Sequence, residues 1–193
     1  MTKSNNADVE KKGKKEIMFE EVNIPEGVVL EVNNLSIKVR GKLGELERSF
    51  ITKRVTFEKQ DSKLKIIAKG DRKNDYKLIR TFKAHIKNMI KGVQEGFTYK
   101  LKICASHFPM KVSIKDNVLK VDNFVGEKHP RKLLIKPGVK VKIDGNFIIV
   151  ESYDKEKAGQ VAADIEQLTR IKNKDRRIFQ DGIYIIEKAG KKV

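Results

Sequence analysis

The sequence contains a single cysteine, no tryptophan and few aromatic residues of any kind. Cys104 cannot form an internal disulfide, which suits a reducing compartment such as the cytosol or the nucleus. We expect it to be a small buried hydrophobic residue, since no activating base lies near it in the sequence. Aromatic residues make up 7% of the chain, too few for the stacking platforms that bind single-stranded bases.

Long apolar runs are absent as well. No stretch approaches the roughly 20 consecutive apolar residues that cross a bilayer. Residues 1–15 are polar and lack the apolar core of a signal peptide. The sequence therefore argues against a membrane protein.

Groups that carry enzyme chemistry are also scarce. His85, His107 and His129 are far apart and have no cysteine partner, so no metal-ligand spacing is present. Gly41 and Gly44 enclose Lys-Leu, whereas a phosphate-binding loop needs Gly-Lys-Ser or Gly-Lys-Thr at the start of a helix. We interpret both glycines as turn residues, with a close backbone approach to RNA as the alternative. The sequence predicts a non-enzymatic protein that uses no metal or cofactor.

Positive charge is what the chain has in excess. Lys and Arg number 43 against 26 Asp and Glu, which gives a formal net charge of +17. Such a surplus destabilises a compact chain by self-repulsion unless an anionic partner neutralises it. Nucleic acid is the first candidate, because binding to its phosphates releases counterions. An anionic membrane surface is the second and weaker one.

The sequence repeats itself at a spacing of 82 residues, which places Val32 on Ile114 and Ile37 on Leu119. The matched segments are residues 29–45 with 111–127, and residues 55–68 with 139–150 once two turn residues are dropped. Similarity at a fixed spacing is typical of a tandem duplication. We therefore expect a basic, flexible tail at 1–18, a first domain at 19–98, a second domain at 99–188 and a short tail at 189–193.

Each copy reads as short strands followed by one helix. Apolar and polar residues alternate in residues 28–32 and 35–39, on either side of a turn-forming pair of asparagines. Apolar residues at spacings of three and four then predict two helices, with Ile79, Phe82, Ile86, Met89 and Val93 in the first and Ala158, Val161, Ile165, Leu168 and Ile171 in the second. The predicted fold class is α+β, with two tandem domains that each have an antiparallel sheet covered by one helix. Residues 99–103 alternate like a strand and could extend one of these sheets.

A stripe of cations follows the first predicted helix. Its members are Lys73, Lys77, Arg80, Lys83, Lys87 and Lys91. A solvated helix surface is the leading interpretation. The near absence of acids for i,i+4 pairing favours RNA contact as the alternative, and we take Lys91 as a candidate.

Two further groups of cations lie in the second copy. One follows the second helix, where the helical pattern ends, and consists of Arg170, Lys172, Lys174, Arg176 and Arg177. Cations on a loop can follow a phosphate backbone, so we expect phosphate contact there. The other consists of Lys128, His129, Arg131 and Lys132. For that group, phosphate contact and simple solvation are equally open.

Three stretches of sequence are more specific than these patterns. They are residues 88–100 with His107-Phe-Pro109, residues 123–128 with 136–139, and residues 172–184. Together they resemble the universal large-subunit ribosomal protein family L-six, called L-nine in older eukaryotic naming, in its archaeal and eukaryotic branch. Gly41-Lys-Leu-Gly44 stands where the family usually has Gly-Pro-x-Gly, and a tryptophan pair common in eukaryotic members is absent. These departures indicate a divergent member.

The resemblance implies a structural protein on large-subunit rRNA, near the sarcin-ricin loop and the stalk base. Its partners would be this rRNA and neighbouring ribosomal proteins, with translational GTPases close by. Lys172, Lys174, Arg176 and Arg177 would face the rRNA. The expected location is the cytoplasmic ribosome, with assembly in the nucleolus if the source is a eukaryote. The alternative is an RNA- or membrane-binding adaptor outside the ribosome that uses the same basic surfaces.

Overall fold

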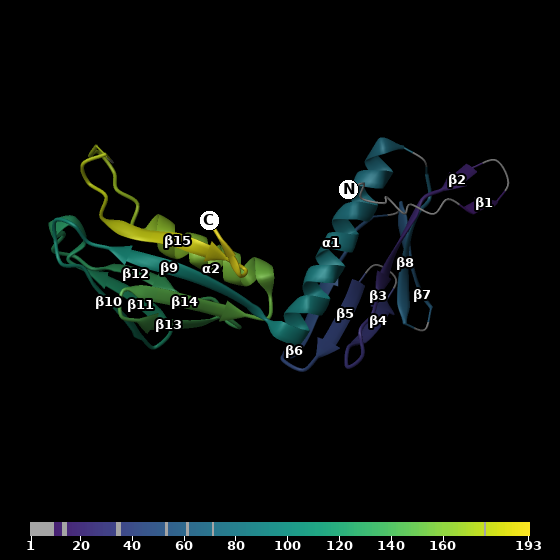
Figure 1. Ribbon diagram of the computed structural model, residues 1–193, viewed down its shortest axis with the longest axis horizontal. Coiled ribbons are helices and arrows are strands. Elements are labelled where there is room, and N and C mark those ends of the chain that lie inside the picture. Colours follow the sequence, from purple (N-terminus) through teal and green to yellow (C-terminus); the bar gives the residue numbers. More distant parts are fainter. Residues whose placement is uncertain are drawn as a thin grey trace. The chain divides into compact units, whose positions relative to one another are not determined.

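The computed structural model describes residues 10–12, 15–33, 36–52, 54–60, 62–70, 72–175 and 177–193 (Figure 1). The chain divides into two compact units, residues 1–95 and 96–193. Each unit has its own hydrophobic core. No helix in the described ranges combines the length and the apolar character needed to cross a membrane.

The first unit has two three-stranded antiparallel sheets and one long helix. One sheet has the order β4-β5-β6, with β4 at Val29–Asn33, β5 at Ser36–Gly41 and β6 at Gly44–Ser49. The other has the order β3-β8-β7, with β3 at Phe19–Asn23, β7 at Val55–Gln60 and β8 at Lys63–Ala68. Helix α1 spans Lys73–Glu95 and packs against strands of both sheets (Figure 1).

The second unit repeats this plan and adds strands. A three-stranded sheet has the order β10-β11-β12, with β10 at Lys111–Lys115, β11 at Val118–Asp122 and β12 at Arg131–Leu134. A five-stranded sheet has the order β13-β14-β9-β15-β16, with β13 at Lys140–Asp144, β14 at Phe147–Ser152, β9 at Phe97–Cys104, β15 at Gly182–Lys188 and β16 at Lys191–Lys192. A short 3-10 turn, η1, lies at Phe124–Gly126, and helix α2 spans Lys155–Leu168.

Strand register confirms the duplication and the α+β fold class. Val32 faces Ile37 across β4 and β5, and Ile114 faces Leu119 across β10 and β11. These two pairs are the residues that the 82-residue spacing placed on one another. Residues 99–103 lie in β9, the central strand of the second sheet, as their alternation suggested. The extra strand β15 pairs with β9 on the side opposite β14.

The helices bury the apolar faces that their spacing predicted. Ile79, Ile86 and Val93 of α1 are fully buried in the first core, and each such side chain stabilises the fold by about 1.5–3 kcal/mol. Ile171, predicted as the last apolar position of the second helix, lies beyond its end. Helix α2 ends at Leu168, because Thr169 leaves helical geometry and its hydroxyl accepts a hydrogen bond from the amide of Ile183 (2.9 Å).

Gly41 and Gly44 flank the turn between β5 and β6, as predicted. The end of α1 closes against this turn, and the amide of Leu43 donates to the carbonyl oxygen of Val93 (2.9 Å). A Cβ on Gly41 would lie 2.7 Å from Cγ2 of Val93. The close approach that requires this glycine is therefore made by the helix of the same unit.

The predicted tail at residues 1–18 contains two short strands in its described part. These are β1 at Glu10–Lys12 and β2 at Lys15–Ile17, which pair in antiparallel fashion with Glu10 opposite Ile17. Residues 1–9, 13 and 14 lie outside the described residues.

Candidate RNA interface

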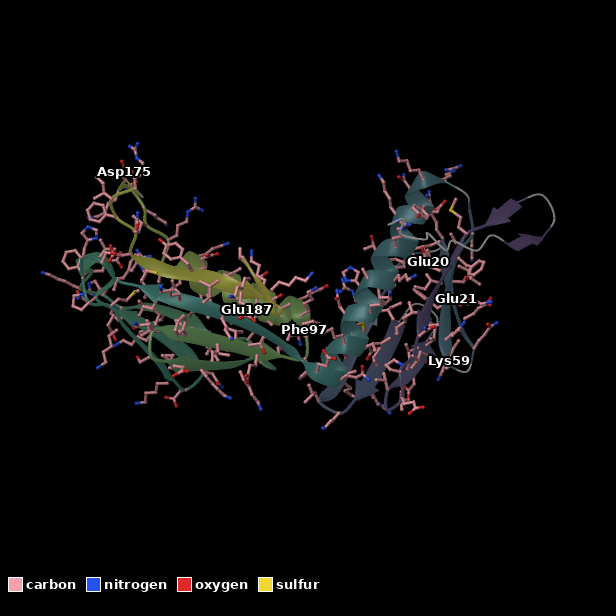
Figure 2. All side chains as sticks on the ribbon, viewed as in Figure 1. Glu20, Glu21, Lys59, Phe97, Asp175 and Glu187 are labelled. Carbon is pink, nitrogen blue, oxygen red and sulfur yellow. The ribbon has the colours of Figure 1, made fainter. Side chains whose placement is uncertain are left out.

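The cations that follow the second helix lie on one exposed segment between α2 and β15. We call residues 170–180 the basic segment. Thr169 is buried before it and Asp181 is buried after it. In its middle, the amides of Ile178 and Phe179 donate to the carbonyl oxygen of Asp175, at 3.1 and 2.9 Å, and close a turn. Asp175 lies at the tip of this projecting loop, far from the sheet (Figure 2). The segment is thus fixed at both ends and projects between them.

Three members of this group project into solvent. Arg170, Lys172 and Lys174 are exposed. Side chains in this setting can approach a phosphate backbone without first being desolvated. Arg176, the fourth member in sequence order, lies outside the described residues.

Arg177 is exposed and paired within its own turn. Its Nη2 lies 2.8 Å from Oδ2 of Asp175, and 90% of its side chain is exposed. Hydrogen bonds from the Arg177 side chain, and then from its backbone amide, hold the pKa of Asp175 below its ordinary value. An ion pair between exposed side chains gains little in water. Arg177 can therefore exchange this carboxylate for a phosphate.

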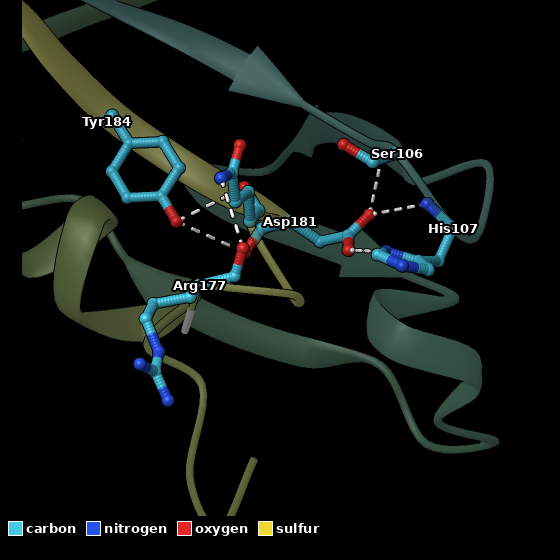
Figure 3. Close-up of polar contacts among 6 residues, drawn as sticks. Ser106, His107, Arg177, Asp181 and Tyr184 are labelled. Atoms are coloured by element: carbon cyan, nitrogen blue, oxygen red, sulfur yellow. Dashed lines mark hydrogen bonds and ion pairs between the residues drawn. The ribbon is translucent and has the colours of Figure 1, made fainter. Parts of the chain in front are cut away.

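Asp181 fixes the end of the basic segment to a distant loop of the same unit (Figure 3). Its Oδ1 accepts hydrogen bonds from the amides of Ser106 (2.6 Å) and His107 (2.9 Å), and its Oδ2 lies 2.7 Å from Nδ1 of His107. Burial raises the pKa of Asp181, but the hydrogen bonds from His107 and Ser106 outweigh it and lower the pKa below its ordinary value. The single O–H of Tyr184 is shared between the carbonyl oxygens of Gln180 (3.2 Å) and Asp181 (3.4 Å). The side chain of Asp181 and the backbone carbonyl groups at this end of the segment are thus hydrogen-bonded.

His107, which binds the carboxylate of Asp181, also makes an aromatic contact with the basic segment. The imidazole of His107 stacks on the ring of Phe179, with centroids 4.8 Å apart and planes 30° apart. The ammonium of Lys174 lies 4.4 Å from the centroid of the same ring, a distance at which a cation is attracted by the ring. Nothing in the sequence linked His107 to residues so far along the chain.

The other group of cations in the second unit adjoins the start of the basic segment. Lys128, His129 and Lys132 are exposed. Arg131 differs, because its guanidinium binds Glu127 through Nε (2.8 Å) and Nη2 (2.5 Å) and also lies 4.3 Å from the centroid of Phe124. Its Nη1 donates to the carbonyl oxygens of Leu168 (2.6 Å) and Arg170 (3.4 Å). Arg131 therefore joins the two cationic groups into one surface and has few donors left for RNA.

The stripe on α1 belongs to the first unit and is partly neutralised. Glu20 of β3 forms ion pairs with Lys83 and with Nε of Arg80 (3.8 Å), and it lies between β3 and α1 (Figure 2). Lys91 pairs with Glu95 at 3.6 Å. Strand β3 therefore supplies, through Glu20, part of the negative charge that is scarce on the helix itself. Lys73, Lys77 and Lys87 remain exposed.

The groups considered for other chemistry do not assemble. Within the described ranges, no three His, Cys, Asp or Glu side chains come close enough to hold a metal ion. Cys104, expected to be buried, is half-buried, because it lies at the end of β9 opposite Gly182.

Comparison with known proteins agrees with the repeated fold. The family described as ribosomal protein L6 matches residues 24–96 and 108–182. The chain is 46% identical over 175 residues to the large ribosomal subunit protein uL6 of Methanococcus vannielii, which covers 91% of this chain and 96% of that protein. It is 43% identical over 169 residues to uL6 of Methanobrevibacter smithii, which covers 88% and 95%. These matches confirm the resemblance found in the sequence, and the chain belongs to the ribosomal protein L6 family.

Proposed function

We propose that this chain is a structural constituent of the large ribosomal subunit and binds large-subunit rRNA through its second unit. Its family consists of structural proteins, so the chain is not an enzyme. The observation that carries the proposed site is the basic segment, whose exposed cations lie between the buried anchors Thr169 and Asp181. Exposed cations on a fixed backbone match the phosphates of folded RNA, which proteins bind largely through shape and backbone contacts.

The proposed interface has a core and a margin. The core is formed by Arg170, Lys172, Lys174 and Arg177, together with Arg176. The margin consists of Lys128, His129 and Lys132, which Arg131 ties to the core through Leu168 and Arg170. Lys91 lies on the first unit and is paired with Glu95, so we give it a minor role.

We further propose a place on the subunit near the sarcin-ricin loop and the stalk base. Neighbouring ribosomal proteins would then be close partners, and translational GTPases would bind nearby. In a eukaryotic source, assembly would take place in the nucleolus. The support for this finer placement is the resemblance of residues 172–184 to the family's C-terminal signature.

A salt series tests the proposed interface. The triple variant Lys172→Ala, Lys174→Ala, Arg177→Ala is compared with the wild type for affinity toward protein-free large-subunit rRNA. A control variant, Lys111→Ala, Lys140→Ala, Lys191→Ala, removes the same charge from exposed positions on β10, β13 and β16. Each lost phosphate contact reduces the slope of log K against log salt by about 1, so the first variant should lose a slope of about 3 and the control much less.

Equal losses in both triple variants would show a general electrostatic effect and reject this interface. The alternative, an adaptor outside the ribosome, is tested by fractionating a cell lysate into free, small-subunit and large-subunit pools. Recovery in the large-subunit pool supports the proposal. Recovery in the free pool, with binding to anionic vesicles after nuclease treatment, would favour the adaptor.

A further inference from the structure

The carboxylate of Asp181 uses both of its oxygens on one loop, and that loop is not part of the proposed interface. Oδ1 accepts from the amides of Ser106 and His107, and Oδ2 accepts from the imidazole of His107. The side chain of Asp181 is 3% exposed. A buried carboxylate is retained only where hydrogen bonds replace its water, so this loop is a necessary partner of the segment end.

The contact extends from the segment end toward its middle. The side chain of His107 is 37% exposed, and its ring stacks on that of Phe179. The backbone amide of Phe179 donates to the carbonyl oxygen of Asp175, and the ammonium of Lys174 lies over the ring of Phe179. Asp181, His107, Phe179 and Lys174 therefore form one continuous series of contacts.

Without this series, the basic segment would be held at its start by Thr169 and by the bond from Arg131 to the carbonyl oxygen of Arg170, and at its end by strand β15. Its backbone would then have to be ordered when RNA binds, and the ordering entropy would be subtracted from the affinity. The final contacts with phosphate would be the same, because no cation is lost. Such a defect lowers affinity and leaves the number of phosphate contacts unchanged.

We propose that His107 is a positioning residue for RNA binding, which holds the basic segment in its binding conformation through Asp181 and Phe179. This inference rests on the proposed rRNA interface and deepens it. His107 acts through its Nδ1–H and its ring face. It makes no phosphate contact of its own, and it acts on Lys174 through the intervening ring.

The test separates positioning from direct contact by the salt dependence of binding. The probe is protein-free large-subunit rRNA, and the proteins are the full chain with His107→Ala, His107→Asn or Lys174→Ala. His107→Ala should weaken binding by about five- to twentyfold with an unchanged slope of log K against log salt. Lys174→Ala should reduce the slope by about 1.

The conservative variant provides the second readout. The side-chain amide of Asn can place its NH2 group where Nδ1 of His107 lies, so it keeps the donor to Asp181 and loses the stacking. His107→Asn should therefore recover part of the affinity lost in His107→Ala. Hydrogen exchange of the Ser106 amide, which donates to Asp181, should accelerate in His107→Ala and less in His107→Asn.

Three results would overturn the positioning role while the proposed interface stands. They are unchanged affinity in His107→Ala, a slope reduced by about 1 in His107→Ala, or no recovery in His107→Asn. If His107→Ala does not fold, Phe179→Leu replaces it, and weaker binding with an unchanged slope is again expected. A wild-type protein that binds this rRNA without steep salt dependence would instead reject the interface itself.

Discussion

Arg131 donates through Nη1 to the carbonyl oxygen of Leu168 at 2.6 Å, and so completes the C-terminal turn of α2 from another part of the fold. The last carbonyl groups of a helix have no partner within it and need a donor from elsewhere. The same guanidinium is held by Glu127 through two of its nitrogens, which fixes its direction. These bonds hold the pKa of Glu127 below its ordinary value.

Arg131→Lys should lower the free energy of unfolding of the second unit and have only a small effect on RNA affinity. A single ammonium group cannot reach Glu127 twice and Leu168 at once. We expect a loss of about 1–3 kcal/mol in the free energy of unfolding, measured by urea denaturation. Lys132→Ala, at the exposed neighbouring position, is the control and should leave stability unchanged. A stable Arg131→Lys with reduced RNA affinity would mean that the guanidinium contacts RNA directly.

Gly41→Ala should destabilise the first unit without changing the proposed interface. The new methyl group would meet Val93, which is fully buried, and the clash is expected to cost about 1–3 kcal/mol. Thermal unfolding of the isolated variant and its rRNA affinity at low temperature give the two readouts. Lys42→Ala in the same turn serves as the matched control. A variant as stable as the wild type would show that the turn and the helix can separate freely.

Asp181 should make the second unit sensitive to acid. Its pKa is depressed in the folded state, so its contribution to stability is complete above the ordinary carboxyl pKa of about 3.9. That contribution is lost as the pH falls through the lower, folded-state value. The melting temperature of the wild type should exceed that of Asp181→Asn at neutral pH, and the gap should narrow below about pH 4. A gap that is constant over this range would contradict the depressed pKa.

Asp175→Asn should strengthen rRNA binding. It removes the carboxylate that pairs with Arg177 and reduces the negative charge on the basic segment. We expect a two- to fivefold gain in affinity, approximately, at low salt and a smaller gain at high salt. Asp116→Asn, in the turn between β10 and β11, changes the net charge equally and is the control. Equal gains in both variants would indicate a general charge effect.

The fold could be predicted because its signals are local or repeated. The alternation of residues such as Val32 and Ile37 specifies strands, and their reappearance at Ile114 and Leu119 specifies a second copy. Helix α1 followed from the spacing of Ile79, Ile86 and Val93. The end of the second helix could not be read in this way, since it depends on a bond between Thr169 and the later residue Ile183.

The sequence shows which cations make up the candidate site, but it does not show which side chains of the same chain they contact. The cations of the basic segment are visible as a cluster in the sequence, but their status as RNA ligands stays a prediction. The ion pair between Lys83 and Glu20 joins residues 63 positions apart, and the hydrogen bond from the backbone amide of His107 to Asp181 joins residues 74 positions apart. No local sequence pattern predicts contacts between residues so far apart in the chain. The guanidinium of Arg131 likewise looks like a free cation in the sequence, although Glu127 and the carbonyl oxygen of Leu168 occupy most of its donors.

The position of β15 also has a consequence for the order of events during synthesis. This strand completes the second sheet beside β9 and follows the basic segment in the chain. A nascent chain released up to α2 already contains every strand of the first unit, which can fold as its domain emerges. The anchor Asp181, and Ile183, whose amide binds the hydroxyl of Thr169, leave the exit channel later. The basic segment therefore cannot reach the conformation proposed for rRNA binding until residues that follow it in the chain have been synthesised and β15 has paired with β9.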